Sequence, residues 1–247
     1  MGSNITSFPV LEHPAPSFTT SEAAELAKFW FKETLDVSPL VSERDQNFLL
    51  TNKKSKKFVL KIANAAESVE VLDFQNQAMN HMAKQDPSLP LPRACLSLDK
   101  QQIHRLELNG NEHFVRVVTY LSGRLLDDFP KDRRDQNLMV SMGQFLGRLD
   151  RGLSDFFHPA AGHALLWDLQ QTPNLHQYLS HIKNKNNLLT AQKTLDHFQE
   201  HIAPKFSMLR TQVIHNDMHL DNVVVNENDT SQVTGMIDFG DRSEEHT

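Results

Sequence analysis

The first half of the chain alternates between helical and strand-like patterns of hydrophobic and polar residues. Apolar residues recur at helical spacing from Ala23 to Trp30, directly after Thr19-Thr20-Ser21-Glu22, which has the form of a capping box. This pattern predicts a helix that runs to about Thr34. The pattern that follows predicts two hairpins separated by a helix: strands 47–50 and 57–62 around a polar loop, a helix over 69–82, and strands 102–108 and 112–121 around Asn109-Gly110-Asn111.

The second half of the chain is mainly helical and then returns to short strands. A regular stripe of leucine, methionine and phenylalanine over residues 138–149 predicts an amphipathic helix. A second helix is predicted over 195–209, kinked or ended by Pro204, and a further helical segment begins at 165–170. Short strands are predicted at 212–214, 223–225 and 233–237. The pattern therefore indicates a small mixed lobe, a connector near residue 123, and a helical lobe that carries a short β-hairpin.

The composition is that of a globular, slightly acidic chain. Its 247 residues suffice for one large domain or two small ones, and its net charge of −6 argues against a nucleic-acid-binding protein. No apolar run reaches the roughly 18 residues of a membrane-spanning helix. The one cysteine, Cys95, excludes an intramolecular disulfide and fits a reducing compartment. We therefore expect a cytoplasmic protein that binds neither nucleic acid nor a membrane.

The candidate chemistry lies near the C-terminus, in residues 215–222 and 237–241. Phosphoryl transfer needs a carboxylate to accept the proton of the attacking hydroxyl, and oxygen ligands to hold Mg²⁺ on the phosphates. Asp217 is the candidate base. Asn222 is the candidate first metal ligand, and Asp238, at the end of the next strand, is the candidate second ligand. A loop and a strand end joined by a hairpin can bring these three side chains to one point.

Two other interpretations of the segment are open at this point. His215, Asp217 and His219 form an H-x-D-x-H pattern, which could bind zinc or iron. The domain could also bind a nucleotide without turnover and regulate a larger fusion protein. A hydrolase triad is disfavoured, because the chain has no G-x-S-x-G motif.

The spacing resembles the protein-kinase signature D-x-x-x-x-N followed by D-F-G. The matching residues are Asp217, Asn222 and Asp238-Phe239-Gly240. With Asn216 in place of the kinase arginine and His219 inside the loop, the segment looks like the aminoglycoside phosphotransferase and choline kinase family.

This resemblance implies an α+β, protein-kinase-like fold of two lobes, with a small mixed β-sheet N-lobe and a mainly helical C-lobe. It implies Mg²⁺ as cofactor and ATP or GTP as co-substrate. It also implies catalysis by Asp217, metal ligation by Asn222 and Asp238, and a structural role for His215.

The resemblance further implies a nucleotide site in the first lobe. Lys61, on an apolar strand, would reach the nucleotide phosphates. Protein kinases pair this lysine with a glutamate on the next helix. The spacing of that helix here places Gln75 at the position, with Glu70 and Asp73 as alternatives.

Two further parts of the nucleotide site follow from the same resemblance. The glycine-free turn 42–47, which begins at Ser42, would cover the phosphates. Backbone groups of Thr119, Tyr120 and Leu121, at the connector between the lobes, would meet the edge of the purine.

The expected organisation is a flexible arm (1–17), a nucleotide-binding N-lobe (18–121), a C-terminally truncated catalytic C-lobe (122–241) and a non-native tail (242–247). Within the family, residues 146–150 and 166–169 look most like a bacterial branch in which the kinase-like domain is fused to a class III aminotransferase, and this branch is also similar to hydroxylysine kinase. This similarity implies a small amino alcohol or hydroxylated amino acid as acceptor, and an aminotransferase domain as a fused or separate partner. We expect weak or no activity from the truncated chain.

Overall fold

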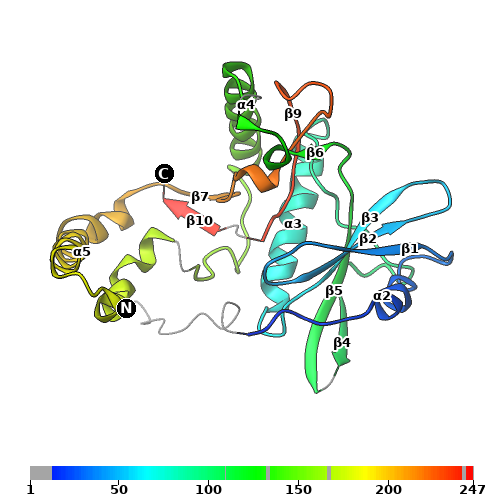
Figure 1. Cartoon of the computed structure of the whole chain (residues 1–247), viewed down its shortest axis with the longest axis horizontal. Helices are drawn as coiled ribbons and strands as arrows, with labels where there is room; N and C mark the ends of the chain where they lie inside the picture. The colour runs from blue at the N-terminus through cyan, green and yellow to red at the C-terminus, as the bar shows by residue number, and fades with distance from the viewer. Residues whose placement is uncertain (1–12, 109, 132–133, 166–167, 241–242, 247) are drawn as a thin grey trace.

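The computed structural model describes residues 13–108, 110–131, 134–165, 168–240 and 243–246, in a β-sheet lobe and a helical lobe (Figure 1). The small lobe is built on a five-stranded antiparallel sheet with the strand order β1-β2-β3-β5-β4. Its strands are β1 (Asp36–Leu40), β2 (Gln46–Thr51), β3 (Lys57–Ile62), β4 (His104–Leu108) and β5 (Asn111–Thr119). Gly110, in the β4–β5 turn, has a φ of 77°, which suits glycine, and Asn109 lies outside the described residues.

The two faces of this sheet bury different side chains, because successive residues of a strand point to opposite sides. Leu60 on β3 and Val117 on β5 pack with α2 (Thr20–Ala27) in one core cluster. Val59, which shares the opposite face with Lys61, packs on a second cluster that includes α3 (Val69–Gln85). The antiparallel register places Lys61 directly across from Arg116. Both basic residues therefore project towards α3 and the helical lobe.

Helix α2 begins with the capping box that the sequence predicts. The Thr19 hydroxyl accepts the Glu22 N–H, and the Glu22 carboxylate accepts the Thr19 N–H. The helix ends at Ala27 rather than near Thr34, because the N–H groups of Phe29 and Trp30 form the i→i−3 bonds of a turn. The predicted start of the helix is confirmed, and its predicted end is wrong.

The segment before α2 is attached to the sheet lobe over the part that the structure describes. The buried Asn64 side chain donates hydrogen bonds to the carbonyl groups of His13 (3.2 Å) and Pro14 (3.3 Å). The same amide also reaches the carbonyl of Arg44 (3.3 Å), in the turn between β1 and β2. The end of the predicted flexible arm is thus held against this turn, and residues 1–12 of the arm lie outside the described residues.

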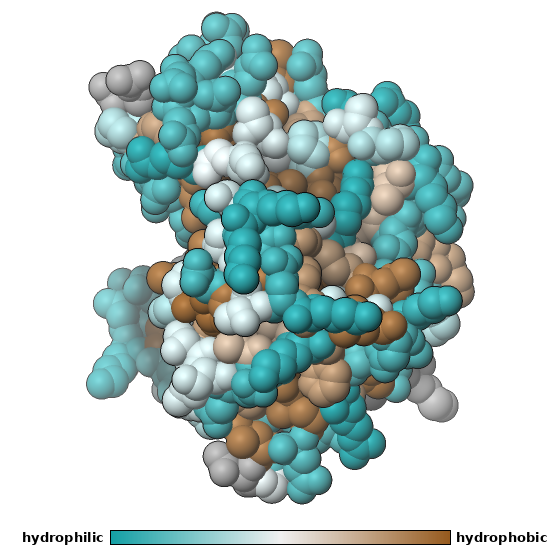
Figure 2. Space-filling view, turned by 90° about the vertical axis from the view of Figure 1, so that its right-hand side faces the viewer, coloured by the Kyte–Doolittle hydropathy of each residue, from teal (hydrophilic) through white to brown (hydrophobic). Residues whose placement is uncertain are grey.

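Helix α3 belongs to the cores of both lobes. Phe74, Met79 and Met82 pack in one cluster with Phe145 and Leu149 of α4 (Gln136–Leu153). The face in Figure 2, on the sheet side of the molecule, is mainly hydrophilic, with apolar side chains in small areas. The principal apolar contacts of the sheet are therefore internal, with α2 on one face and α3 on the other.

The helical lobe carries two small sheets beside α4. One has the strand order β6-β8-β9, and the other pairs β7 with β10. Their bounds are β6 (Arg124–Leu125), β7 (Thr211–Ile214), β8 (Val223–Val225), β9 (Val233–Met236) and β10 (Ser243–His246). A 3-10 turn, η1 (Leu126–Asp128), follows β6 and packs with β8 through Leu126 and Val225.

A group of outer helices lies away from the sheet lobe, at the left of Figure 1. It consists of η3 (Leu169–His181), α5 (Lys185–His197), the π-helical η4 (Phe198–Ile202) and the 3-10 helix η5 (Ala203–Met208). Leu195 is the buried residue of α5. Large apolar side chains of this group, including Leu189, Ile202 and Met208, are exposed.

One sequence prediction is wrong in this region, and one strand of the sheet was not predicted. The helix expected over 195–209 begins ten residues earlier, at Lys185, and changes to π and 3-10 geometry as Pro204 approaches. Strand β1 was not predicted because it contains Pro39. An edge strand tolerates proline, since one side of it needs no hydrogen-bond donor. Among the described residues, no helix is both long and apolar enough to cross a membrane.

Candidate active site

Asp217 and Asn222 face each other within one loop of the helical lobe. The loop leaves β7 at Ile214 and closes with a 3-10 turn, η6 (Leu220–Asn222), before β8. The Asn222 side-chain amide donates to the Asp217 carboxylate (2.6 Å) and to the Asp217 carbonyl (3.1 Å). Asn216, directly before Asp217, has a φ of 62°, in the left-handed region that asparagine adopts more readily than most residues. The loop therefore holds Asp217 through a left-handed turn residue and a short side-chain bond.

His215 holds this loop against the following strand. Its ring is fully buried, and its Nε2 forms a hydrogen bond with the Ile237 carbonyl (3.1 Å). The ring also meets Phe239 edge-on, with the ring centres 5.0 Å apart. His219, by contrast, is exposed and pairs with Asp221 at 3.3 Å. The two histidines of the H-x-D-x-H pattern thus have different partners, and the described residues contain no group of three histidine, cysteine or acidic side chains able to hold a metal ion.

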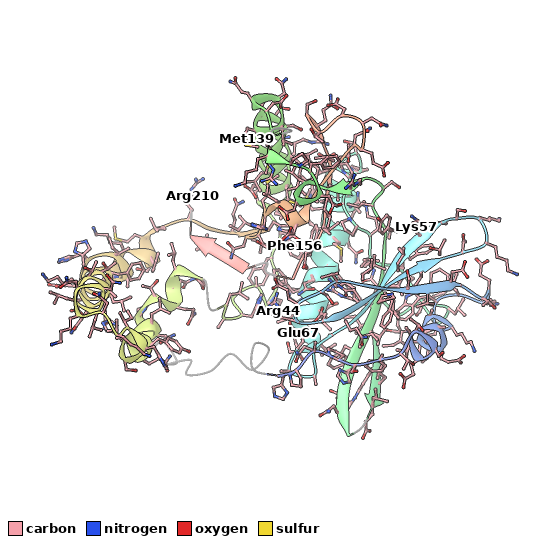
Figure 3. The ribbon with its side chains drawn as sticks, viewed as in Figure 1. Arg44, Lys57, Glu67, Met139, Phe156 and Arg210 are labelled. Atoms are coloured by element: carbon pink, nitrogen blue, oxygen red, sulfur yellow. The ribbon has the colours of Figure 1, made fainter. Side chains whose placement is uncertain are left out.

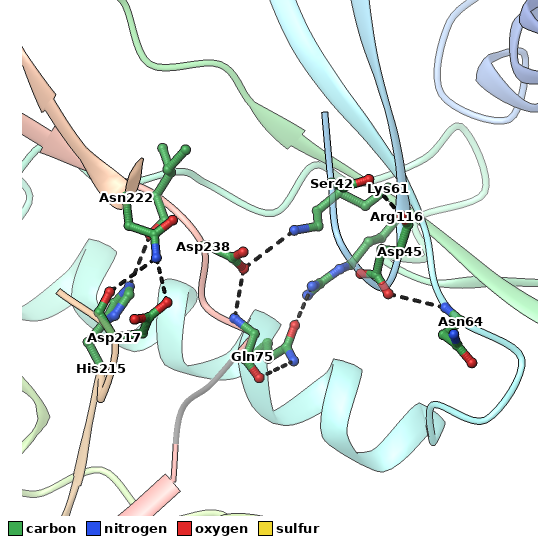
Figure 4. A network of polar contacts seen from close by, with 12 residues as sticks. Ser42, Asp45, Lys61, Asn64, Gln75, Arg116, His215, Asp217, Asn222 and Asp238 are labelled. Atoms are coloured by element: carbon green, nitrogen blue, oxygen red, sulfur yellow. Dashed lines mark hydrogen bonds and ion pairs between the residues drawn. The ribbon is translucent and has the colours of Figure 1, made fainter. Parts of the chain in front are cut away.

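Asp238 lies two residues after the end of β9, the next strand of the hairpin. It too has a left-handed backbone, with a φ of 58°. Its Oδ1 accepts the Gly240 N–H (3.0 Å) and lies 3.7 Å from Lys61 Nζ (Figure 4). The Lys61 ammonium lowers the pKa of Asp238 to about 2, because it stabilises the ionised carboxylate. Asp238 is therefore ionised over the whole physiological pH range.

Lys61 reaches the site from the sheet lobe, but its partner differs from the expected one. The Gln75 side chain bonds with Arg116 and with the Gly240 carbonyl, and among the described residues no hydrogen bond joins it to Lys61. Asp73, the second candidate, pairs with His158. Glu70, the third, is exposed in the first turn of α3. The ion pair of Lys61 thus crosses between the lobes to Asp238, rather than to a residue of the helix.

Asp217 has an environment that suits proton transfer. Burial and the neighbouring Asp238 charge raise the pKa of Asp217, whereas its hydrogen bond with Asn222 opposes the rise. A carboxylate with a raised pKa accepts a proton more readily than an ordinary one. The structure thus brings Asp217, Asn222, Asp238 and Lys61 together, as Figure 4 shows.

The turn between β1 and β2 supplies a residue that the sequence did not predict. The Ser42 hydroxyl donates to the Asp45 carbonyl (2.6 Å) and so closes the turn. Arg44 extends from the turn towards the site (Figure 3), and its Nη2 lies 3.5 Å from the point that a Cβ on Gly240 would occupy. Its charge helps to lower the pKa of Asp238. Arg44 is therefore a side chain of this turn that approaches Asp238 and Gly240.

The connector between the lobes follows β5. The Thr119 N–H bonds with the Arg93 carbonyl (3.0 Å), and the Tyr120 N–H with the Lys57 carbonyl (3.4 Å). Leu121 lies against Gly235 of β9: the Leu121 Cδ1 is only 2.7 Å from the position that a Cβ atom would occupy if residue 235 had a side chain. Two of the three amide groups expected to meet a purine thus already bond within the chain.

These residues fit a divalent cation and a nucleotide. Mg²⁺ takes oxygen ligands from one or two carboxylates and completes its shell with water and phosphate. The ionised Asp238 and the side-chain oxygen of Asn222 are ligands of this kind. Lys61 and Arg44 add positive charge where phosphates would lie.

The protein-kinase-like class of enzymes is defined by three features that this structure combines. These are a two-lobed fold, a lysine on the sheet of the small lobe, and a D-x-x-x-x-N loop that faces a D-F-G turn. The model of one such family, described as "Phosphotransferase enzyme family", matches residues 36–243. The chain belongs to this family.

Comparisons with individual proteins agree with this family. Hydroxylysine kinase from Danio rerio is 28% identical in an alignment 242 residues long, and the matched region covers 92% of this chain and 66% of the relative. An amicoumacin kinase solved with AMP-PNP and Ca²⁺ has a TM-score of 0.69 at 15% identity, over 92% of this chain and 65% of that one. A microcompartment-associated aminopropanol kinase has a TM-score of 0.61 at 14% identity, over 92% and 71%. The structural matches establish the kinase-like fold.

The chain spans about two thirds of the length of hydroxylysine kinase and of the amicoumacin kinase.

Proposed function

We propose that the protein transfers the γ-phosphate of ATP or GTP to a hydroxyl group of a small amino alcohol or hydroxylated amino acid. The observation that carries this proposal is the meeting of Asp217, Asn222 and Asp238 with Lys61 from the opposite lobe. The acceptor class follows from the similarity to hydroxylysine kinase and from the aminopropanol kinase among the structural neighbours.

Each residue has a distinct part in the proposed reaction. Asp217 accepts the proton of the attacking hydroxyl, and the Asn222 amide keeps its carboxylate in one orientation. Asn222 and Asp238 would hold Mg²⁺, which neutralises phosphate charge when bound. Lys61, with Ser42 and Arg44 in the β1–β2 turn, would contact the phosphates. Thr119, Tyr120 and Leu121 would meet the purine, with the Leu121 N–H as the expected donor.

A second candidate is a nucleotide-binding domain without turnover. The replacement of the kinase glutamate by Gln75 favours it, since Lys61 then lacks its usual partner on the helix. The short Asn222–Asp217 bond and the raised pKa of Asp217 favour catalysis, because a binding domain needs neither. A fused or separate aminotransferase partner and a cytoplasmic location stay predictions.

The test is a turnover screen that compares two variants with the wild type. Nucleotide consumption and phosphorylated product would be measured with hydroxylysine, aminopropanol and related amino alcohols, using ATP and GTP in turn with Mg²⁺. Asp217→Asn should retain nucleotide binding and lower turnover by roughly 10²-fold or more, because the general base is lost. Asp238→Ala should weaken binding of the metal–nucleotide complex itself. Equal turnover of Asp217→Asn and wild type would exclude the proposed mechanism, whereas wild-type nucleotide binding without any product would favour the second candidate.

A further inference from the structure

The interior between the sheet and α3 contains a buried arginine that the proposed reaction does not use. Arg116 is 3% exposed, and its nearest partners, Gln75 (2%) and Asn76 (0%), are neutral. Burial lowers the pKa of Arg116, because the charged form loses its water. The negative charges of Asp45, Asp238 and Glu67 oppose this lowering and so compensate part of the cost of the buried cation. The hydrogen bonds of the guanidinium nevertheless go to neutral amides, and this choice of partners calls for an explanation.

The hydrogen bonds of Arg116 lead to the turn that carries Asp238. One guanidinium nitrogen, Nη2, donates to the Gln75 side-chain oxygen, and the other, Nη1, donates to Asn76 Oδ1 (3.0 Å). The Gln75 Nε2 donates to the Gly240 carbonyl (3.4 Å), and the Gly240 N–H donates to Asp238 Oδ1 (3.0 Å). Figure 4 shows this series of contacts from β5 through α3 to the turn.

The chemistry of the guanidinium fixes the orientation of Gln75. Arginine has donors and no acceptor, so it can bind the oxygen of the Gln75 amide and not the nitrogen. The Gln75 NH₂ group must then point away from Arg116, which is where the Gly240 carbonyl lies. A glutamate at this position would also accept from Arg116, and more strongly because of its charge, but it could not donate to Gly240.

We propose that Arg116 is a positioning residue for the cation site: through Gln75 it fixes the Gly240 end of the turn, and so the Asp238 carboxylate. This arrangement stands where protein kinases have the lysine–glutamate pair. It deepens the proposed function and rests on it, because the positioned carboxylate is the expected ligand of Mg²⁺. The simpler alternative is that Arg116 only fastens β5 to α3.

A matched pair of variants separates these two roles. Gln75→Glu keeps an acceptor for Arg116 but removes the donor to Gly240. Asn76→Asp brings the same negative charge to the same guanidinium from the adjacent residue, and it leaves the Gln75–Gly240 contact in place. The Asn76 side-chain nitrogen has no hydrogen-bond partner among the described residues, so its replacement by oxygen breaks no bond there. Arg116→Met removes the start of the series.

The experiment measures the Mg²⁺ concentration that gives half-maximal binding of a fluorescent ATP analogue to the full chain, without acceptor. Gln75→Glu and Arg116→Met should each raise this concentration by about 10-fold or more, as expected for a residue that orients a metal ligand. Asn76→Asp should leave it unchanged. Binding of the analogue in EDTA should be equal in all four proteins, and circular dichroism would check that each is folded.

A similar Mg²⁺ midpoint for Gln75→Glu and Asn76→Asp would overturn the positioning role, even if Arg116→Met failed to fold. If the wild type bound no nucleotide in Mg²⁺, the proposed function itself would fall, and the positioning role with it. The two failures are distinguishable, because the first appears only in the variants.

Discussion

Replacing Lys61 by methionine tests the ion pair that joins the two lobes. Lys61 Nζ lies 3.7 Å from Asp238 Oδ1, with the side chains 13% and 46% exposed. Two unit charges about 4 Å apart attract by roughly 1 kcal/mol in water and roughly 4 kcal/mol near a protein surface. Because the carboxylate is nearly half exposed, screening brings the expected value close to the lower limit. Lys61→Met should therefore lower the free energy of unfolding at pH 7 by about 1 kcal/mol.

The pH dependence of this loss follows from the depressed pKa of Asp238, which is about 2 in the folded protein. A carboxylate whose pKa falls on folding stabilises the protein above its unfolded pKa of about 3.9, and this stabilisation disappears as the pH falls through the folded value. The difference between wild type and Lys61→Met should thus be constant above about pH 5 and shrink between about pH 4 and 2.

Two measurements check this prediction. Urea unfolding at a series of pH values gives the stability difference, and carbon-13 NMR of labelled aspartate gives the pKa of Asp238, which should rise towards its ordinary value in the variant. Lys57→Met is the control, because Lys57 lies on the same strand but contacts the Tyr120 ring instead, at 5.3 Å. An unchanged pKa of Asp238 in Lys61→Met, or an equal loss of stability in Lys57→Met, would refute the reasoning.

Two further predictions concern the base and the core. The midpoint of the acid limb in the profile of kcat/KM against pH should lie above the ordinary aspartate pKa of about 3.9, because burial and the Asp238 charge raise the pKa of Asp217. A midpoint below that value would contradict the assignment of the base. Leu149→Ala should lower the free energy of unfolding by about 2–5 kcal/mol, since Leu149 is fully buried in the cluster shared by both lobes. Met139→Ala, on the same helix but 48% exposed, should change it by no more than about 0.5 kcal/mol in the same chemical-denaturation assay.

The sequence predicted those parts of the site that depend on local spacing. Asp217 and Asn222 share one short loop, and Asp238 follows the next strand, so a hairpin alone brings them together. Strand alternation likewise explains why Lys61 points away from the α2 core, although its apolar neighbours Leu60 and Ile62 point into it.

The residues that the sequence did not predict act over long separations along the chain. Arg116 meets Gln75 across 41 residues, and Gln75 meets Gly240 across 165. No periodicity links such positions, because their contact depends on strand register and on the packing of α3. The expectation that Gln75 serves Lys61 failed for this reason: its oxygen is already bound by the arginine opposite Lys61 in the neighbouring strand.

The same register explains how the sheet lobe can hold the turn that carries Asp238. Lys61 and Arg116 are direct neighbours in β3 and β5, and each reaches the turn by a separate route. Lys61 acts on the Asp238 carboxylate through charge, and Arg116 acts on Gly240 through Gln75. A shift of the sheet relative to the helical lobe would disturb both contacts together. The lysine expected to bind the phosphates and the carboxylate expected to bind the metal are therefore positioned by one structural unit, although they come from different lobes.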